Sequence, residues 1–307
     1  LEKINKNAIV KMKNNPLVSI VITTKNEEKN IENCLKSIKE QLYSNIEIIV
    51  IDNGSDDKTC EIAKKYIDKV FTKGPERSAQ RNYGMIDKSD GKYVMFVDAD
   101  MLLSPDLVQC AVEMMQDKKY VALHIKEIVL GNNYFSQVRR FERTFYDGTV
   151  IDGARFFDKE KFVQSGGFDI SMSGPEDWDI DKKMKKIGKI GLLDTKHTWN
   201  TWALEKFIKN KGVDPKKHGA TIYHNESEFD LKKYLDKKGY YATSFDTYIT
   251  KWGKNDPDLK KQLGLGYRYF GVFLENGKWK KVCSHPQYTF GMYYLRFLVG
   301  IKYLTRK

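Results

Sequence analysis

The chain has 307 residues, a net charge of +12 at pH 7 and a sequence pI near 9.2. This length suffices for one large domain with its own core and an appendage, and the positive charge predicts an anionic partner such as phosphate or acidic lipid. The cations are mostly lysines spread over predicted helical faces, without an arginine-rich arm or zinc-finger spacing, which argues against nucleic acid as a partner.

The four cysteines are widely spaced and form no Cys-x-x-Cys motif. Three of them, Cys34, Cys60 and Cys110, lie in helical patterns, which favours reduced, buried thiols over disulfides or zinc ligands; Cys283 stands apart. A cytoplasmic protein is therefore expected. The sequence shows no signal peptide and no uncharged apolar run of transmembrane length.

The first elements alternate between strand and helix. Residues 1–15 are a Lys- and Asn-rich lead, expected to fray or to form a short surface helix. A strand over 17–23 precedes a helix over 26–42, in which apolar residues recur at helical spacing. A strand over 46–51 precedes a helix over 56–66 whose acidic start supplies cap residues. Such alternation across short loops predicts a parallel, doubly wound α/β sheet.

The next elements lead to a strand with an acidic end. A short strand is expected over 69–72 and a helix over 77–87. Residues 93–97 form a continuous apolar run, typical of a central strand covered on both faces, and Asp98 and Asp100 follow it. Ligands bind at the carboxyl edge of such sheets. Two carboxylates there predict a Mg²⁺ or Mn²⁺ site that could hold a diphosphate, and an acidic surface turn is the alternative.

The pattern loosens in the second half of the chain. One or two strands are expected over 121–130, a helix over 135–146 and a short strand over 221–224. An acidic segment is expected to precede a basic helix over 180–186. From residue 227 onward, the Lys- and Tyr-rich sequence predicts mainly helices.

Six short motifs stand in one order along residues 16–225, each of them weak alone. They are Val18–Glu28, Ile49–Asp56, Ser78–Gly84, Val97–Asp100, Gly166–Asp169 and Glu176–Asp179. In this order and spacing they resemble glycosyltransferase family 2. The resemblance implies an inverting enzyme with the GT-A fold, a Rossmann-like doubly wound mixed sheet. Residues 226–307 would then be a mainly helical extension that could contact a membrane.

The resemblance also implies a nucleotide-sugar site. In the family, the residues that match Glu27 and Asp52 contact the nucleotide base, and the arginine that matches Arg81 lies beside the nucleotide. Considered alone, these residues could instead be a helix-dipole acid, a turn former and a surface arginine, respectively. The full expected set is Thr23, Glu27, Asp52, Arg81, Asp98, Asp100 and Glu176.

A metal and a base are implied as well. Asp98 would face the ribose side, while Asp100, with Asp98 and His224, would hold Mn²⁺ or Mg²⁺ against the leaving diphosphate. A purely structural role is the alternative for His224. Asp177 matches the family's catalytic base, which takes the proton of an attacking hydroxyl. Helix capping is the alternative for Asp177.

These motifs predict an inverting, metal-dependent glycosyltransferase. It would move one sugar from a nucleotide sugar, UDP-linked by preference, to a hydroxyl of a glycan or a lipid-linked saccharide; the Gln-x-x-Arg-Trp motif of processive members is missing. One alternative is a polyprenyl-phosphate glycosyltransferase with a GDP- or UDP-sugar, because an ionised phosphate acceptor needs no base. A nucleotidyltransferase would be expected to have a Gly-rich phosphate loop after the first strand, and residues 23–28 contain none. A non-catalytic nucleotide-sugar-binding module is the remaining alternative.

The last predicted helix, 288–307, could contact a membrane. Its cations Arg296, Lys302, Arg306 and Lys307 fall within roughly 140° of arc, opposite an apolar surface. This pattern is typical of an interfacial helix on an anionic membrane, here the inner face of the cell membrane, and would favour a polyprenyl-linked acceptor. Packing of the helix on the core is the alternative.

Overall fold

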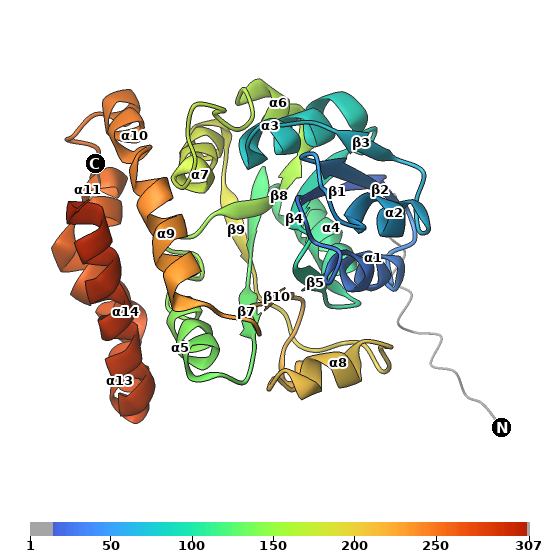
Figure 1. Ribbon diagram of the computed structural model, residues 1–307. Helices are drawn as coiled ribbons and strands as arrows, with labels where there is room; N and C mark the ends of the chain where they lie inside the picture. Colours follow the sequence, from blue (N-terminus) through green and yellow to red (C-terminus); the bar gives the residue numbers. More distant parts are fainter. Residues whose placement is uncertain (1–14, 306–307) are drawn as a thin grey trace.

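The computed structural model describes residues 15–305; the predicted N-terminal lead, except for its last residue, and residues 306–307 lie outside the described residues. A seven-stranded sheet with the order β3-β2-β1-β4-β8-β6-β9 forms its centre (Figure 1). β8 runs antiparallel to β4 and β6, and the other neighbours are parallel, so the sheet is mixed. Its strands are β1 (Val18–Thr24), β2 (Ile46–Asp52), β3 (Val70–Thr72), β4 (Tyr93–Asp98), β6 (Ala122–Ile125), β8 (Ala154–Asp158) and β9 (Ile190–Leu193).

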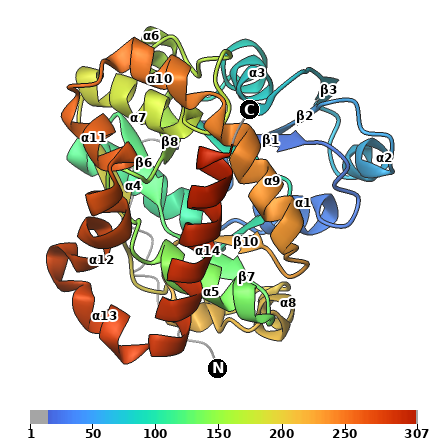
Figure 2. The ribbon, with the colours of Figure 1, turned by 60° about the vertical axis from the view of Figure 1, so that its left-hand side comes forward.

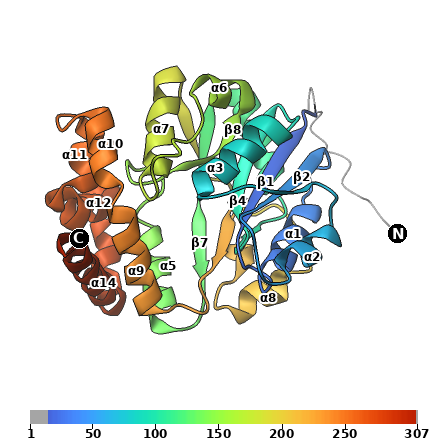
Figure 3. The ribbon, with the colours of Figure 1, turned by 45° about the horizontal axis from the view of Figure 1, so that its top comes forward.

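Helices cover both faces of this sheet. All seven residues of β1 are buried, including Ser19, Thr23 and Thr24, as is typical of a central strand covered on both faces. One core lies between the sheet and α1 (Ile31–Lys39) and α4 (Leu107–Lys118). A second core lies between the opposite face and α6 (Lys159–Gln164) and α7 (Glu176–Ile187). Figure 3 shows the two layers, with α3 (Arg77–Asn82), α6 and α7 on one side and α1 and α2 (Thr59–Lys64) on the other. The expected doubly wound architecture is confirmed.

A small second sheet begins directly after the acidic pair. Its strands are β5 (Met101–Leu103), β10 (Ile222–Asn225) and β7 (Glu127–Leu130), in the order β5-β10-β7. β10 pairs antiparallel with β5, and His224 stands opposite Met101. This pairing places His224 next to the carboxyl end of β4.

The region after β10 is helical, as predicted. α14 packs against α5 and α9, and Figure 2 shows the three helices together. None of the helices in residues 15–305 combines the length and apolar character that a membrane span requires. The helices after β10 are α9 (Leu231–Ala242), α10 (Phe245–Trp252), α11 (Pro257–Leu263), α12 (Val272–Leu274), α13 (Trp279–Ser284) and α14 (Pro286–Leu304), and α5 (Tyr134–Arg143) precedes β10 in the chain.

Three local expectations need correction. The helix expected over 77–87 is α3 (Arg77–Asn82) followed by a π-helical segment over 83–88. α1 ends at Lys39, and Leu42 beyond it is 56% exposed. α7 begins at Glu176, so the acidic pair lies in its first turn, where carboxylates favour the positive end of the helix dipole.

The cations of α14 do not share one exposed face. Arg296 is only 7% exposed and pairs with Glu142 of α5 at 3.0 Å, so its predicted exposure is wrong. Lys302 pairs with Asp236 of α9 at 2.9 Å. The other two predicted cations, Arg306 and Lys307, lie outside the described residues.

Replacement of a core ring tests the position of β8. Phe156 is fully buried, and its ring centroid lies 5.5 Å from that of Tyr93 on β4. Phe156→Ala should lower the free energy of unfolding by about 3–5 kcal/mol because it leaves a cavity in the core. Urea unfolding measures this, with Phe290→Ala as control, which is 73% exposed and should change stability by about 0.5 kcal/mol at most. Equal effects would contradict a central β8.

Candidate active site

Three neighbouring strands end at one edge of the large sheet. The register pairs Thr23 of β1 with Asp98 of β4, and Thr24 with Asp52 of β2. The Thr23 hydroxyl donates to Asp98 Oδ1 at 3.1 Å. The structure thus brings the predicted residues Thr23, Asp52 and Asp98 together at the carboxyl edge, where ligands bind in such sheets.

The two residues expected near a nucleotide base differ in their surroundings. Glu27 accepts from Asn30 at 2.7 Å, and burial raises its pKa, with Asp100 and Asp98 adding to the shift. The negative charges of the acidic pair therefore act on Glu27. Asp52 is 2% exposed and accepts from both the backbone N–H, at 2.8 Å, and the hydroxyl of Ser55. Asp52 thus does form the turn that the sequence offered as its alternative role.

Arg81 of α3 is a buried hub rather than a surface residue. It is 1% exposed, so the surface-arginine alternative is wrong. Its guanidinium lies 2.9 Å from Asp177 Oδ1, 3.2 Å from Asp98 Oδ1 and 3.8 Å from Glu176 Oε1. The ring of Phe96 covers it at 3.9 Å from the guanidinium carbon. One cation thus connects the end of β4 with the first turn of α7.

This arrangement sets the charges of the acidic groups. Burial alone would raise the pKa of Asp98, but Arg81 and Arg155 outweigh it and hold that pKa well below its usual range. Glu176 behaves oppositely: burial and the neighbouring Asp177 raise its pKa, although Arg77 lies 2.8 Å away. Asp98 is thus held ionised at neutral pH.

A second cluster surrounds His224. Its Nε2 lies 3.1 Å from Asp100 Oδ2 and its Nδ1 lies 2.9 Å from Glu127 Oε1. Burial would lower the pKa of His224, but these two carboxylates raise it well above its usual value. Glu127 also pairs with Arg143 at 2.7 Å and Arg155 at 2.9 Å. The sequence did not reveal Glu127, because it lies inside an expected strand and belongs to no motif.

The residues around Asp100 fit a divalent cation. Asp100 Oδ1 is buried and has no hydrogen-bond partner in the described structure, which leaves a hard oxygen free. A deprotonated His224 Nε2 could join it, with Glu127 fixing the proton on Nδ1. Within residues 15–305, no three His, Cys, Asp or Glu side chains form a ready-made metal site. The other ligands would therefore come from phosphate oxygens and water, as is usual for Mg²⁺.

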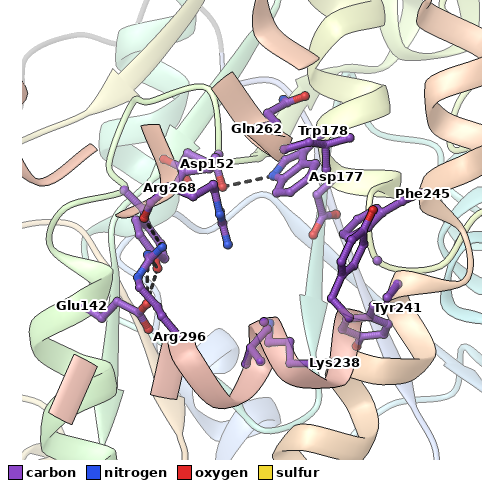
Figure 4. A pocket seen from close by; sticks show the side chains of 18 of the residues that line it. Glu142, Asp152, Asp177, Trp178, Lys238, Tyr241, Phe245, Gln262, Arg268 and Arg296 are labelled. Atoms are coloured by element: carbon purple, nitrogen blue, oxygen red, sulfur yellow. Dashed lines mark hydrogen bonds and ion pairs between the residues drawn. The ribbon is translucent and has the colours of Figure 1, made fainter. Parts of the chain in front are cut away.

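A cavity of about 860 Å³ opens beside Asp177 (Figure 4). Helices α5, α7, α9 and α14 contribute to its walls. Asp177 and Glu176 line it, whereas Glu27, Asp52, Asp98 and Asp100 do not. The candidate base therefore shares the cavity with Glu176, whereas these four candidate nucleotide and metal residues lie outside its lining. Such a volume is in the range of known small-molecule sites.

Residues 19–171 match the family model described as glycosyl transferase family 2. Over 325 residues the chain is 24% identical to hyaluronan synthase of Pasteurella multocida, covering 94% of this chain and 32% of that protein. The chain spans less than half of the length of the first curated relatives that it matches.

Two solved structures share the fold. The mannosyltransferase PcManGT from Pyrobaculum calidifontis, in complex with GDP-Man and Mn²⁺, matches with a TM-score of 0.59 and 18% identity, covering 95% of this chain and 88% of that one. TarS 1–349 of S. aureus, in complex with UDP-GlcNAc, matches with a TM-score of 0.52 and 16% identity, covering 94% and 89%. At such identities the likeness shows the fold alone.

Removal of the Arg81 charge tests its role as a hub. Arg81→Met should lower the free energy of unfolding by about 3–5 kcal/mol at pH 7, because Asp98 and Asp177 lose their shared cation. The lowered pKa of Asp98 contributes stability above its unfolded value, near 4, and this contribution is lost as the pH falls. Urea unfolding should therefore show a penalty that stays nearly constant between pH 7 and pH 4 and shrinks below pH 4, as Asp98 becomes protonated in the folded state.

The matched control is an exposed cation. Lys36 pairs with Glu32 at 2.9 Å on the surface of α1, and Lys36→Met should cost about 1 kcal/mol at most. A penalty for Arg81→Met that equals this control, or that does not shrink below pH 4, would contradict the role of Arg81 as the shared cation of Asp98 and Asp177.

Proposed function

Because the chain is a glycosyltransferase domain that belongs to family 2 and has the GT-A fold, we propose that it transfers a single sugar, with inversion, from a nucleotide sugar to an acceptor hydroxyl. The observation that carries the proposal is the bridge made by Arg81. It joins Asp98, at the donor edge of the sheet, to Asp177, beside the cavity. An inverting reaction needs a donor and a base on opposite sides of one reacting carbon.

The donor would lie along the ends of β1, β2 and β4. We propose UDP first and GDP as the alternative, since a carboxylate such as Glu27 can accept from the ring N–H of uracil or guanine. The solved structures support nucleotide sugars of both kinds, with UDP-GlcNAc in one and GDP-Man in the other. Asp52 would help to position the nucleotide base through the turn that it forms with Ser55.

Asp100 and His224 would hold Mn²⁺ or Mg²⁺, with Asp98 next to them. When bound, such a cation neutralises the charge on the leaving nucleoside diphosphate. Glu127 keeps the imidazole of His224 oriented toward Asp100. Mn²⁺ in the Pyrobaculum calidifontis complex supports this assignment.

Asp177 would act as the base. The acceptor oxygen forms a bond to the anomeric carbon, the bond from that carbon to the diphosphate oxygen breaks, and the hydroxyl proton passes to Asp177. Arg81 and the first turn of α7 fix the position of its carboxylate. The acceptor would be a glycan or a lipid-linked saccharide in the cavity that Asp177 lines.

The alternatives that remain are a polyprenyl-phosphate acceptor and a non-catalytic nucleotide-sugar-binding module. Peripheral contact with a membrane, on its cytoplasmic face, is part of the proposal. Its support is the exposure of Phe290, Phe297 and Leu304 on α14. Amphipathic helices that bury such side chains bind at lipid interfaces.

The variant Asp177→Asn tests whether Asp177 is the general base of the transfer. Transfer from a panel of UDP- and GDP-sugars with Mn²⁺, followed by mass spectrometry, should slow by about 10²- to 10⁴-fold because no group accepts the hydroxyl proton. Nucleotide binding, measured by calorimetry, should stay intact. Asp194→Asn, which alters a surface carboxylate, should leave both unchanged. Undiminished transfer in Asp177→Asn would favour an ionised phosphate as acceptor, and no transfer by the wild type would favour the binding module.

The metal site is tested by Asp100→Asn. Thermal-shift titrations of UDP and GDP should show stabilisation that needs Mn²⁺ or Mg²⁺ in the wild type, since a ligand of the native state raises its stability. Asp100→Asn should abolish the metal-dependent part, and Glu127→Gln should weaken it about 10- to 100-fold. Nucleotide binding that is indifferent to both metals would contradict the metal-dependent mechanism.

A further inference from the structure

The cavity beside Asp177 carries more positive than negative charge. Among the described residues, seven arginines and lysines but four aspartates and glutamates line it. Several of these cations are neutralised by carboxylates. Arg296, for instance, pairs with Glu142 at 3.0 Å, and Arg77 pairs with Glu176 at 2.8 Å.

Arg268 and Lys238 are the exceptions. No carboxylate of residues 15–305 lies within ion-pair distance of either side chain. Arg268 lies over the ring of Trp178 at 5.9 Å, and Lys238 over that of Tyr234 at 5.4 Å. Burial lowers the pKa of Lys238 to about 7, and nearby Arg139 adds to this shift. Two basic side chains without a carboxylate partner thus lie in one partly dehydrated cavity, and an anion from outside the chain would stabilise their charged forms.

A buried donor in the same cavity also lacks an acceptor. Arg296 is 7% exposed, and its Nε has no hydrogen-bond partner in the described structure. A guanidinium Nη1 of Arg296 donates to the carbonyl of Arg268, so the two residues are adjacent. Figure 4 shows Arg268 and Arg296 on one side of the open space, Asp177 across from them and Lys238 on the helix between. An anion here would receive charge-assisted hydrogen bonds.

Part of the cavity wall is apolar and reaches the surface. Phe297 and Leu304 of α14 line the cavity and are 60% and 83% exposed. Leu265 and Phe270, before α12, line it too and are also exposed. One continuous cavity therefore combines the candidate base, an unneutralised cationic patch and an apolar exit.

From this combination, and resting on the proposed transfer reaction, we propose that the acceptor is an anionic amphiphile: a saccharide phosphate or diphosphate with an apolar chain. Its phosphate lies between Arg268, Lys238 and Arg296, and its chain leaves along Phe297 and Leu304. The saccharide hydroxyl then faces Asp177 in the same cavity. This arrangement selects for charge and for an apolar chain at once.

Binding of simple probes to the full chain tests the proposal without knowledge of the sugar. Decyl phosphate, inorganic phosphate and decyl glucoside are titrated by calorimetry below their critical micelle concentrations. Decyl phosphate should bind at least about tenfold, or ~1.4 kcal/mol, more tightly than either of the other two. Arg268→Gln and Lys238→Gln should each weaken decyl phosphate by at least about tenfold, whereas Lys233→Gln, an exposed lysine of α9, should not.

The melting temperature and nucleotide binding distinguish a ligand-binding role of the two cations from a structural one. Because neither cation has a carboxylate partner, Arg268→Gln and Lys238→Gln should leave the melting temperature unchanged or raise it, and a large fall would overturn the proposal in favour of a structural role. Equal affinity for decyl glucoside and decyl phosphate, or equal effects of Lys233→Gln and Lys238→Gln, would also overturn it. Nucleotide binding with Mn²⁺ should persist in both variants; its absence in the wild type would contradict the proposed function itself.

Discussion

The site depends on one buried positive charge. A guanidinium that is 1% exposed is tolerated only with partners of opposite charge, and Arg81 finds them at the end of β4 and in the first turn of α7. The two partners are 79 residues apart in sequence, yet a single side chain sets their separation. Because Phe96 packs against the guanidinium, this separation is supported by the core of the sheet rather than by a loop.

Charges alternate through the rest of the site. Glu127 balances Arg143 and Arg155, and it also holds the imidazole that faces Asp100. Arg155 in turn helps to keep the pKa of Asp98 low. The donor edge and the wall of the cavity are thus electrostatically coupled. Loss of the Glu127 charge would leave Arg143 and Arg155 in the cavity wall, and His224 beside Asp100, without their shared carboxylate.

Much of the fold could be predicted, because the central strands are uninterrupted apolar runs that end in Asp52 and in the Asp98–Asp100 pair. The contacts of Arg81 could not, since helical spacing does not tell which elements pack on α3. β8 and β9 were missed because Arg155 and Gly191 interrupt their short apolar runs, which leaves no clear strand pattern. Arg296 was placed on the wrong side because α14 is apolar over most of its surface, so its helical periodicity does not identify the buried face.

The acidic pair lies where the two sheets meet, since β4 of the large sheet ends at Asp98 and β5 of the small sheet starts at Met101. The middle strand of the small sheet, β10, is supplied more than 120 residues later. During synthesis, therefore, the large sheet has all its strands while the imidazole beside Asp100 has yet to be made. A slip of β10 by one residue would turn that imidazole to the opposite face. His224 is therefore the last of the candidate metal ligands to be synthesised, and its position depends on the correct register of β10.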